Sequence, residues 1–227
     1  MMIFPLVLAA TIATQPVPSH ATIAIDTTQA NRWAGSRIEV DVWNRPDVVV
    51  DQEVVGGNPD DVRAVVKREG DRLSIVADYH GPQRSTFFGL IRLSNGSFRW
   101  VVHVPAGHSV SVSESNGRIT INGVTAPLVA HTSNGTIDVH GAGPNVDART
   151  SNGSVNVGIT TLAGGPPRIT LRSSNGHIDL SVPRGFATRV EAATANGRVT
   201  NPFANAAGAG SASARTSNGS IDITSGS

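Results

Sequence analysis

The chain has 227 residues, which is room for one large domain or two small ones around an apolar core. Charged residues make up only 15% of the chain, and the formal net charge is +1. This balance excludes a nucleic-acid binder that works by bulk charge, because such a protein neutralises a row of phosphates. Cysteine is absent, which excludes disulfide bonds and thiolate metal sites.

The N-terminus is an apolar run that passes into a Pro/Ser stretch and ends at Ala21. Small residues at the last position and at Ser19 are typical of a secretory signal, although no basic residue lies in this run. A membrane-spanning helix needs about 20 apolar residues, and this run is interrupted at Gln15. We predict a signal peptide at 1–21, export to the periplasm or cell surface, and no transmembrane segment after cleavage.

Residues 22–88 are predicted to form an N-terminal β cap and the first coils of one continuous domain. Apolar residues alternate from Arg37 to Trp43, and two further strand-like runs flank Gly70 as a hairpin. The stretch that follows His80 carries Arg84, Phe87 and Phe88. These three residues are the predicted partner-binding group, because aromatic and arginine side chains are common anchors at interfaces.

Residues 89–227 contain a repeat of Ser-Asn-Gly, with one Ala-Asn-Gly variant. Successive asparagines are 21, 18, 18, 23, 21 and 22 residues apart. A period of this kind is the signature of a repeat architecture. The predicted corner residues are Asn95, Gly96, Asn116, Gly117, Asn134, Gly135, Asn152, Gly153, Asn175, Gly176, Asn196, Gly197, Asn218 and Gly219.

Apolar and polar residues alternate strictly around each asparagine. Apolar residues occupy the third and fifth positions after it, as in Ile137 and Val139, except that Asn201 takes the fifth position of one repeat. A period of two with β-branched residues on one face predicts strands with one buried face. The fold class is therefore predicted to be all-β.

Two architectures fit this alternation. One is a single-domain β-solenoid, or β-helix, of roughly 20-residue coils with Ser-Asn-Gly corners. The other is an antiparallel hairpin meander with Asn-Gly type I′ turns, in which Arg172 faces Asp179 and Arg215 faces Asp222. The near-constant interval favours the solenoid, because a meander needs no constant loop length.

The solenoid makes three local predictions. The asparagines form an amide ladder, and the corner glycines have positive φ. Stacked in chain order, the outward column places Asp138, Asp179 and Asp222 two coils apart, so that no two carboxylates are neighbours.

Two further predictions concern loops and the end of the array. The 23-residue interval contains Gly164-Gly165-Pro166-Pro167, which predicts a loop on the functional face. The last repeat has no capping unit after it, so the strand Ile221–Ile223 is predicted to be an open edge available for self-association.

The search for chemistry gives no catalytic residue, metal or cofactor. Seven histidines show no metal-ligand spacing, and no nucleophile motif is present. A polysaccharide-cleaving β-helix could use Asp138, Asp179 and Asp222, but catalytic acids need burial and these face outward. We assign these aspartates to solubility.

The repeated Thr-Ser-Asn-Gly-x-Ile-x-Val units, with Val-Pro-x-Gly at Val104 and Val182, resemble the bacterial putative-adhesin β-strand-repeat family. The resemblance covers roughly Ile38 to Ile223. It implies an exported β-helical domain without enzymatic activity, which binds an unknown protein or glycan at the cell envelope. A structural envelope protein that self-associates is the alternative.

Overall fold

The computed structural model describes residues 8–19, 21–30, 33–55, 59–80 and 94–226. Regular structure in these ranges is β-strand, apart from two single-turn 3₁₀ helices, η1 (Thr28–Ala30) and η2 (Pro59–Asp61). These ranges hold no helix with the length and apolar character needed to cross a bilayer. The all-β prediction is confirmed.

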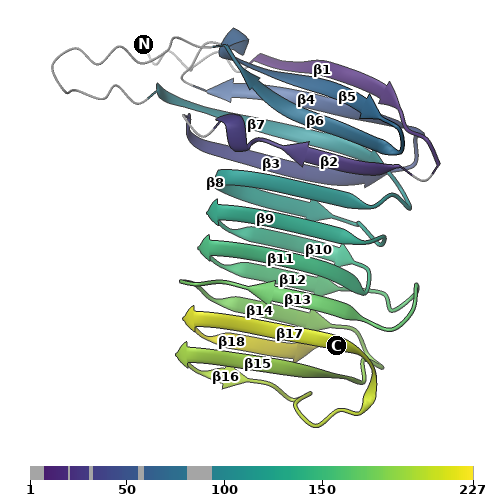
Figure 1. Cartoon of the computed structure of the whole chain (residues 1–227), viewed down its shortest axis with the longest axis vertical. Helices are drawn as coiled ribbons and strands as arrows, with labels where there is room; N and C mark the ends of the chain where they lie inside the picture. Colours follow the sequence, from purple (N-terminus) through teal and green to yellow (C-terminus); the bar gives the residue numbers. More distant parts are fainter. Residues whose placement is uncertain (1–7, 20, 31–32, 56–58, 81–93, 227) are drawn as a thin grey trace, which may run out of the picture.

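The repeat array consists of two sheets of parallel strands (Figure 1). The chain runs along one sheet, turns at an Asn-Gly corner and continues in the other sheet. The front sheet contains, in spatial order, β8 (Val110–Asn122), β9 (Leu128–Asn134), β11 (Asn145–Asn152), β13 (Arg168–Arg172), β17 (Gly208–Asn218) and β15 (Thr188–Asn196). The back sheet contains the second half of β8, then β10 (Ile137–Ala142), β12 (Val155–Ile159), β14 (Ile178–Val182), β18 (Ile221–Ser225) and β16 (Val199–Thr200).

These pairings contradict the antiparallel meander. Every described pairing among β8 to β18 is parallel, and the register shifts in only two of them, between Val139 and Ala142 and between Thr188 and Val190. Arg172 pairs with Arg149 and Arg215 rather than facing Asp179. The Asn-Gly corner therefore passes the chain between two sheets instead of folding one strand back on its neighbour.

The N-terminal segment extends both sheets at one end of the stack. In the front sheet, β8 is followed by β2 (Thr22–Asp26), β6 (Arg72–Tyr79) and β5 (Val62–Glu69). In the back sheet, it is followed by β3 (Trp33–Trp43), β7 (Ser94–Pro105), β4 (Asp47–Val55) and β1 (Leu8–Pro16). The predicted hairpin around Gly70 is confirmed, because β5 and β6 pair antiparallel.

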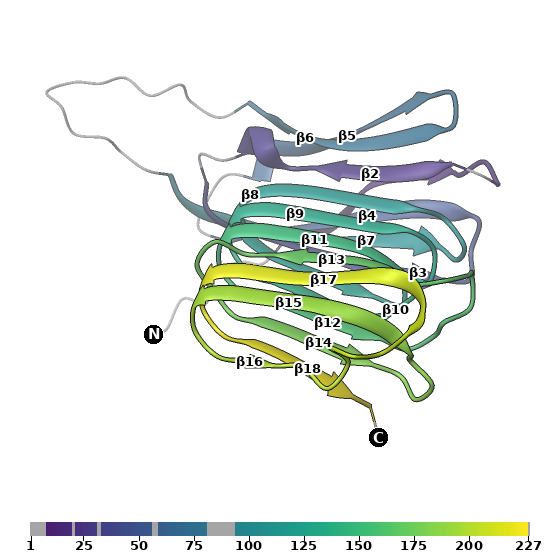
Figure 2. The same cartoon turned by 60° about the horizontal axis from the view of Figure 1, so that its bottom comes forward.

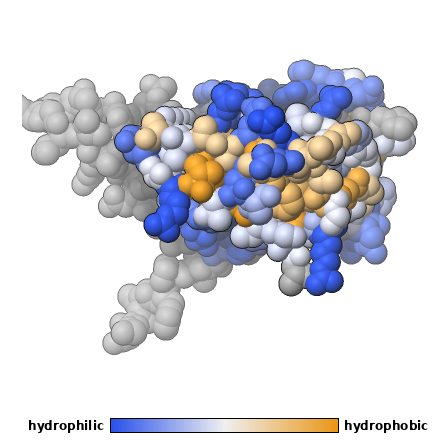
Figure 3. All heavy atoms as spheres, turned by 90° about the horizontal axis from the view of Figure 1, so that it is seen from below, coloured by the Kyte–Doolittle hydropathy of each residue, from blue (hydrophilic) through white to orange (hydrophobic). Residues whose placement is uncertain are grey.

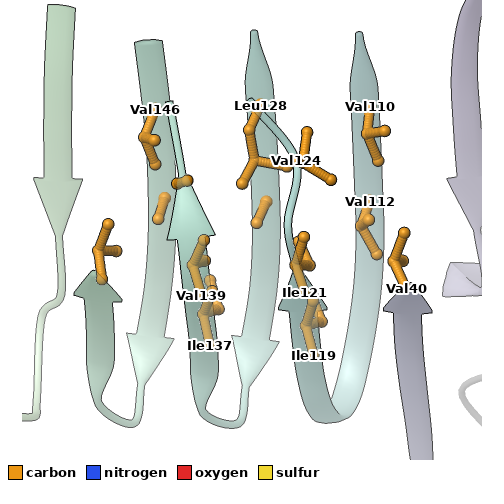
Figure 4. Close-up of a cluster of buried hydrophobic side chains, with 14 of the residues drawn as sticks. Val40, Val110, Val112, Ile119, Ile121, Val124, Leu128, Ile137, Val139 and Val146 are labelled. Atoms are coloured by element: carbon orange, nitrogen blue, oxygen red, sulfur yellow. The ribbon is translucent and has the colours of Figure 1, made fainter. Parts of the chain in front are cut away.

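The core lies between the two sheets, where inward side chains from both meet (Figure 4). In the two-strand units other than β15/β16, the alternate residues identified by the repeat are buried, as in Ile119, Ile121, Ile137 and Val139, all at most 1% exposed. Full burial of such a side chain contributes about 1.5–3 kcal/mol. Each unit can bury its apolar residues only against its neighbours, so the stack is the source of stability.

The units are not stacked in chain order. After β14, the chain skips one level of the stack and forms β15 and β16. It then returns and forms β17 and β18 in the skipped level, between β13/β14 on one side and β15/β16 on the other (Figure 2). The connections that allow this are residues 183–187 and 201–207. Consequently β15/β16, and not β17/β18, ends the stack.

This order makes the predicted open edge at Ile221–Ile223 wrong. Strand β18 pairs with β14 on one side and β16 on the other, and Ile221 and Ile223 are 0% and 1% exposed. The physical reason is that Asn201 interrupts the apolar column of β15/β16. A polar side chain at that position costs less free energy at the end of the stack, where it is partly solvated, than in the interior, where it would be buried.

The end of the stack has its own cover, seen end-on in Figure 3. The amide of Asn201 donates to the carbonyl of Val190 at 2.8 Å, and the carbonyl of Phe203 accepts from Val190 N–H at 3.2 Å. Phe203 also packs edge-on against Phe186, with ring centroids 5.2 Å apart. Hydrophobic residues remain in the middle of this face (Figure 3). In the end unit, Val199 on β16 is 39% exposed. The unit β15/β16 is therefore the terminal cap that the sequence analysis did not identify.

Candidate functional site

The corners form a continuous column of hydrogen bonds along one side of the stack. Five asparagine side chains each donate from Nδ2 to Oδ1 of the asparagine in the neighbouring unit, at 2.8–2.9 Å, and Asn116 at the start of the column accepts. The column follows spatial order: Asn116, Asn134, Asn152, Asn175, Asn218 and Asn196. The predicted amide ladder is confirmed for these six residues. Asn95 and Gly96 lie at the start of β7, and their side-chain environment is outside the described part.

The corner glycines are required for close approach more than for positive φ. Positive φ occurs at Gly153, Gly176, Gly197 and Gly219, whereas Gly117 and Gly135 do not have it. The shared feature is a neighbouring backbone: a Cβ on any of the six would lie 1.7–2.1 Å from a backbone carbonyl oxygen of the adjacent unit. The prediction of positive φ at every corner is therefore wrong for Gly117 and Gly135. The requirement for glycine that all six corners share is that the stacking leaves no space for a side chain.

A threonine or serine two positions before the asparagine also contributes to the corner. Thr150, Ser173, Thr194 and Thr216 each donate a hydroxyl hydrogen bond to the glycine carbonyl of the adjacent unit, at 2.9–3.0 Å. The sequence signal was visible in the repeated Thr-Ser-Asn-Gly, but the analysis assigned no role to this position. The corner is a structural element, and its side chains are engaged within the stack.

The outer face of the front sheet carries a column of basic residues. His131, Arg149, Arg172 and Arg215 occupy one register position on four successive strands, β9, β11, β13 and β17. Neighbouring strands lie about 4.8 Å apart, so three guanidinium groups follow one another along the stack. We call Arg149, Arg172 and Arg215 the arginine ladder.

Carboxylates neutralise the ladder only at its two ends. Asp147 accepts two hydrogen bonds from Arg149, at 2.7 and 2.6 Å, and Glu191 lies 3.4 Å from Arg215. The central Arg172 is exposed, and it forms no ion pair with any residue in the described ranges. An exposed arginine between two other arginines is a favourable position for an external anion.

The N-terminal end of the molecule shows the opposite arrangement. There Arg99 on β7 lies beside both Glu39 and Glu53. The hydrogen bond to Glu39, together with the charges of both carboxylates, raises the pKa of the Arg99 guanidinium above its ordinary value. Arg99, unlike Arg172, is therefore paired within the protein, which leaves the arginine ladder as the better candidate for a ligand.

A groove of about 520 Å³ lies on the same face of the front sheet, beside the ladder. Val129, Asp147 and Thr170 line it from the strands, and Arg168 adds a further exposed guanidinium. Gly164 and Pro166 line it from the loop between β12 and β13. The loop predicted from the 23-residue interval is thus present and borders this groove.

The outer face of the back sheet carries the aspartates. Asp138, Asn156, Asp179 and Asp222 occupy one register position on β10, β12, β14 and β18. Because β18 lies next to β14, Asp179 and Asp222 are direct neighbours, and the predicted separation of all carboxylates is wrong for this pair. Their side chains are 53% and 39% exposed. Both carboxylates are therefore open to solvent.

The predicted partner-binding residues Arg84, Phe87 and Phe88 lie outside the described residues. The arginine ladder was not among the predicted sites. Its members are 23 and 43 residues apart in the sequence, and only the order of the strands brings them together.

No protein-family model matches this sequence, and no curated protein matches it. Solved structures do match. A protein from Clostridium sporogenes described as a "putative cell adhesion protein" has a TM-score of 0.58 at 9% identity, over 97% of this chain and 100% of that chain. A "putative adhesin" from Bacteroides fragilis has a TM-score of 0.42 at 12% identity, over 96% and 97% of the two chains. A "putative lipid binding protein" from Parabacteroides distasonis has a TM-score of 0.25 at 13% identity, over 96% and 97%.

The name of the Clostridium sporogenes protein agrees with the adhesin-family resemblance of the repeat. Of the three, this protein alone reaches the similarity expected of a shared fold, and at 9% identity the likeness concerns the fold alone. The chain therefore has the fold of this Clostridium sporogenes protein.

Proposed function

We propose that this chain is an exported β-solenoid that acts as a non-enzymatic, adhesin-like binding module. In this proposal, the outer face of the front sheet binds an anionic glycan at the cell envelope. The arginine ladder supplies the charge contacts, and the groove beside it accommodates part of the ligand.

The observation that carries the proposal is the unpaired central arginine. Arg172 lies in register between Arg149 and Arg215, and like charges on directly opposed residues are destabilising. A linear polymer with repeated carboxylate or phosphate groups complements such a row, because arginine binds these groups through paired hydrogen bonds. Hydroxyl groups of Thr170 and Ser213, in the adjacent column, add donors and acceptors for sugar hydroxyls.

Two further observations support the architecture and the absence of catalysis. The parallel, in-register stacking of successive units is the arrangement of a solenoid. The neighbouring carboxylates of Asp179 and Asp222 are solvated rather than buried, at 53% and 39% exposed. Stacked strands offer a long, flat surface, which suits an extended ligand better than a small substrate.

The binding test uses residues 22–227 and polygalacturonate, a carboxylated glycan, with neutral dextran as the comparison. We expect polygalacturonate to bind, and the affinity to fall as salt is raised, because screening weakens exposed charge contacts. The double variant Arg172→Gln/Arg215→Gln should weaken binding by at least about tenfold, which corresponds to 1.4 kcal/mol.

The matched control is Arg63→Gln/Arg68→Gln, which removes the same charge from exposed positions on β5. It should leave the affinity unchanged. If both double variants weakened binding equally, the effect would come from net charge and not from the arginine ladder. If length-matched single-stranded DNA bound equally well, the surface would bind polyanions in general and would not be specific for a glycan.

Export is tested separately. The full chain, expressed in a bacterial host with an envelope, should yield a mature protein that begins at Thr22. Detection of intact Met1 in the envelope fraction would contradict cleavage. Cleavage would also remove β1 and leave the edge of β4 without this antiparallel partner.

A further inference from the structure

We propose that His177, Asp179 and Asp222 bind a divalent transition-metal ion of the zinc class on the outer face of the back sheet. The imidazole Nε2 of His177 lies 3.0 Å from Oδ1 of Asp179 and 3.4 Å from Oδ2 of Asp222. One ligand atom from each residue lies within 4.8 Å of the other two. This site is on the opposite sheet from the arginine ladder and is independent of glycan binding.

The order of the units creates this cluster. Asp179 and Asp222 are in-register partners on β14 and β18, and the side chain of His177 projects between them from the corner before β14. If the units were stacked in chain order, the neighbour of Asp179 would be Thr200, which in the structure lies on β16 in the end unit. The insertion of β17/β18 therefore brings a second carboxylate to the histidine.

The two carboxylates lack the compensation that Asp138 receives in the same column. Asp138 accepts a hydrogen bond from Asn156 at 2.7 Å and lies 3.5 Å from Arg118. Within the described ranges, no arginine or lysine forms an ion pair with Asp179 or Asp222. Two adjacent carboxylates repel each other, and a cation held between them removes that repulsion.

The donor set and its spacing favour zinc over calcium. Zinc takes nitrogen and carboxylate ligands at about 2.0–2.2 Å in a tetrahedral arrangement, which places ligand atoms about 3.3 Å apart. The two histidine–carboxylate separations, 3.0 and 3.4 Å, bracket this value. Calcium takes 6–8 oxygen ligands, whereas this cluster offers one nitrogen and two carboxylates.

The cluster is open to solvent. The side chains of His177, Asp179 and Asp222 are 36%, 53% and 39% exposed. An ion can therefore enter without any movement of the backbone, and water can complete the coordination. Because the chain contains no cysteine, thiolates do not compete for the metal.

The test is a calorimetric titration of the full chain, freed of metal, with zinc chloride. We expect one ion to bind at this cluster, with a higher melting temperature in zinc but not in magnesium. His177→Ala and Asp222→Asn should each lower the zinc affinity by at least about tenfold. Asp138→Asn, from the same column but outside the cluster, should leave the affinity unchanged.

Melting temperatures without metal show whether each variant folds, and we expect Asp222→Asn to be as stable as the native chain or more so. The proposal is overturned if the native chain does not bind zinc. It is also overturned if His177→Ala binds zinc as the native chain does, or if calcium binds more tightly than zinc. Glycan binding by the opposite sheet would be unaffected by any of these results.

Discussion

The units that are stacked in chain order differ from the reordered units in how outward charges are placed. Between β11/β12 and their neighbours, Arg149 pairs with Arg172 but is bound by Asp147, two residues before it, and Asn156 separates two aspartates. Between β13/β14 and β17/β18, arginine pairs with arginine on one face and aspartate with aspartate on the other. Inward residues match equally well in both cases, as Ile178 against Ile221 shows. The outward charges therefore follow from the order of the stack and do not set it.

This difference has a functional meaning. Natural sequences agree with their fold at most positions and depart from local rules mainly at functional sites. Like-charged in-register pairs are such a departure, and where β13/β14 meet β17/β18 they occur on both faces at the same level of the stack. One face would attract an anion and the other a cation. A single rearrangement of the chain therefore adds Arg215 to the Arg149–Arg172 pair on one face and brings Asp222 beside Asp179 on the other.

The largest expected effect comes from a direct test of the strand order, which asks whether β17 lies between β13 and β15. Thr170 pairs in register with Ser213, whereas Glu191 lies one strand further. A disulfide needs a Cα separation of about 4.4–6.8 Å, which suits strands about 4.8 Å apart. In a chain without natural cysteines, Thr170→Cys/Ser213→Cys should form a crosslink on oxidation, and Thr170→Cys/Glu191→Cys should not. Crosslinking of the second pair alone would show that β15 lies next to β13 and that the units are stacked in chain order.

The next largest effect concerns the residue that decides which unit ends the stack. Ile223 is 1% exposed between two neighbouring strands, so Ile223→Asn buries an amide and should cost about 4 kcal/mol. Asn201→Ala, at the corresponding position of the end unit, removes hydrogen bonds to Val190 and Phe203 and should cost about 1–2 kcal/mol. Denaturant unfolding measures both losses. Equal losses of unfolding free energy would contradict the assignment of β15/β16, and not β17/β18, to the end of the stack.

Corner stacking is common to both sets of units and should be expensive to disturb. A Cβ at Gly153 would lie 2.1 Å from the carbonyl oxygen of Gly135, so Gly153→Val should cost about 3 kcal/mol. Gly158→Ala is the control, because the nearest atom to its Cβ outside the adjoining residues would be the carbonyl oxygen of Val139, at 3.6 Å. The midpoint of denaturant unfolding should change strongly for the first variant and little for the second. A small change for Gly153→Val would mean that the corners can separate.

Much of the fold could be predicted from the sequence because it depends on local patterns. The alternation around Ile137 and Val139 predicts strands, and the Asn-Gly interval predicts the ladder from Asn116 to Asn196. The stacking order could not be predicted in this way. Every unit offers the same inward pattern and the same corner, so each can pair with any other.

The signal for the order was a single departure from the pattern. Asn201 stands where other units have an apolar residue, and this marks β15/β16 as the unit that tolerates an open side. Both candidate sites depend on that order, because Arg215 and Asp222 reach their partners only after the exchange. Residue spacing alone therefore suggested neither the ladder nor the His177 cluster.

The smallest expected effect is a difference in sign between two arginines of the ladder. Arg172→Thr removes a charge that lies between Arg149 and Arg215, so it should raise the free energy of unfolding by about 0.3 kcal/mol at low salt. Arg149→Thr removes the two hydrogen bonds to Asp147, so it should lower that free energy by a similar amount. Salt screens exposed charges, so both differences should shrink as the salt concentration rises. If Arg172→Thr destabilised the chain at low salt, its neighbours could not both be arginines, and the inserted position of β17 would be wrong.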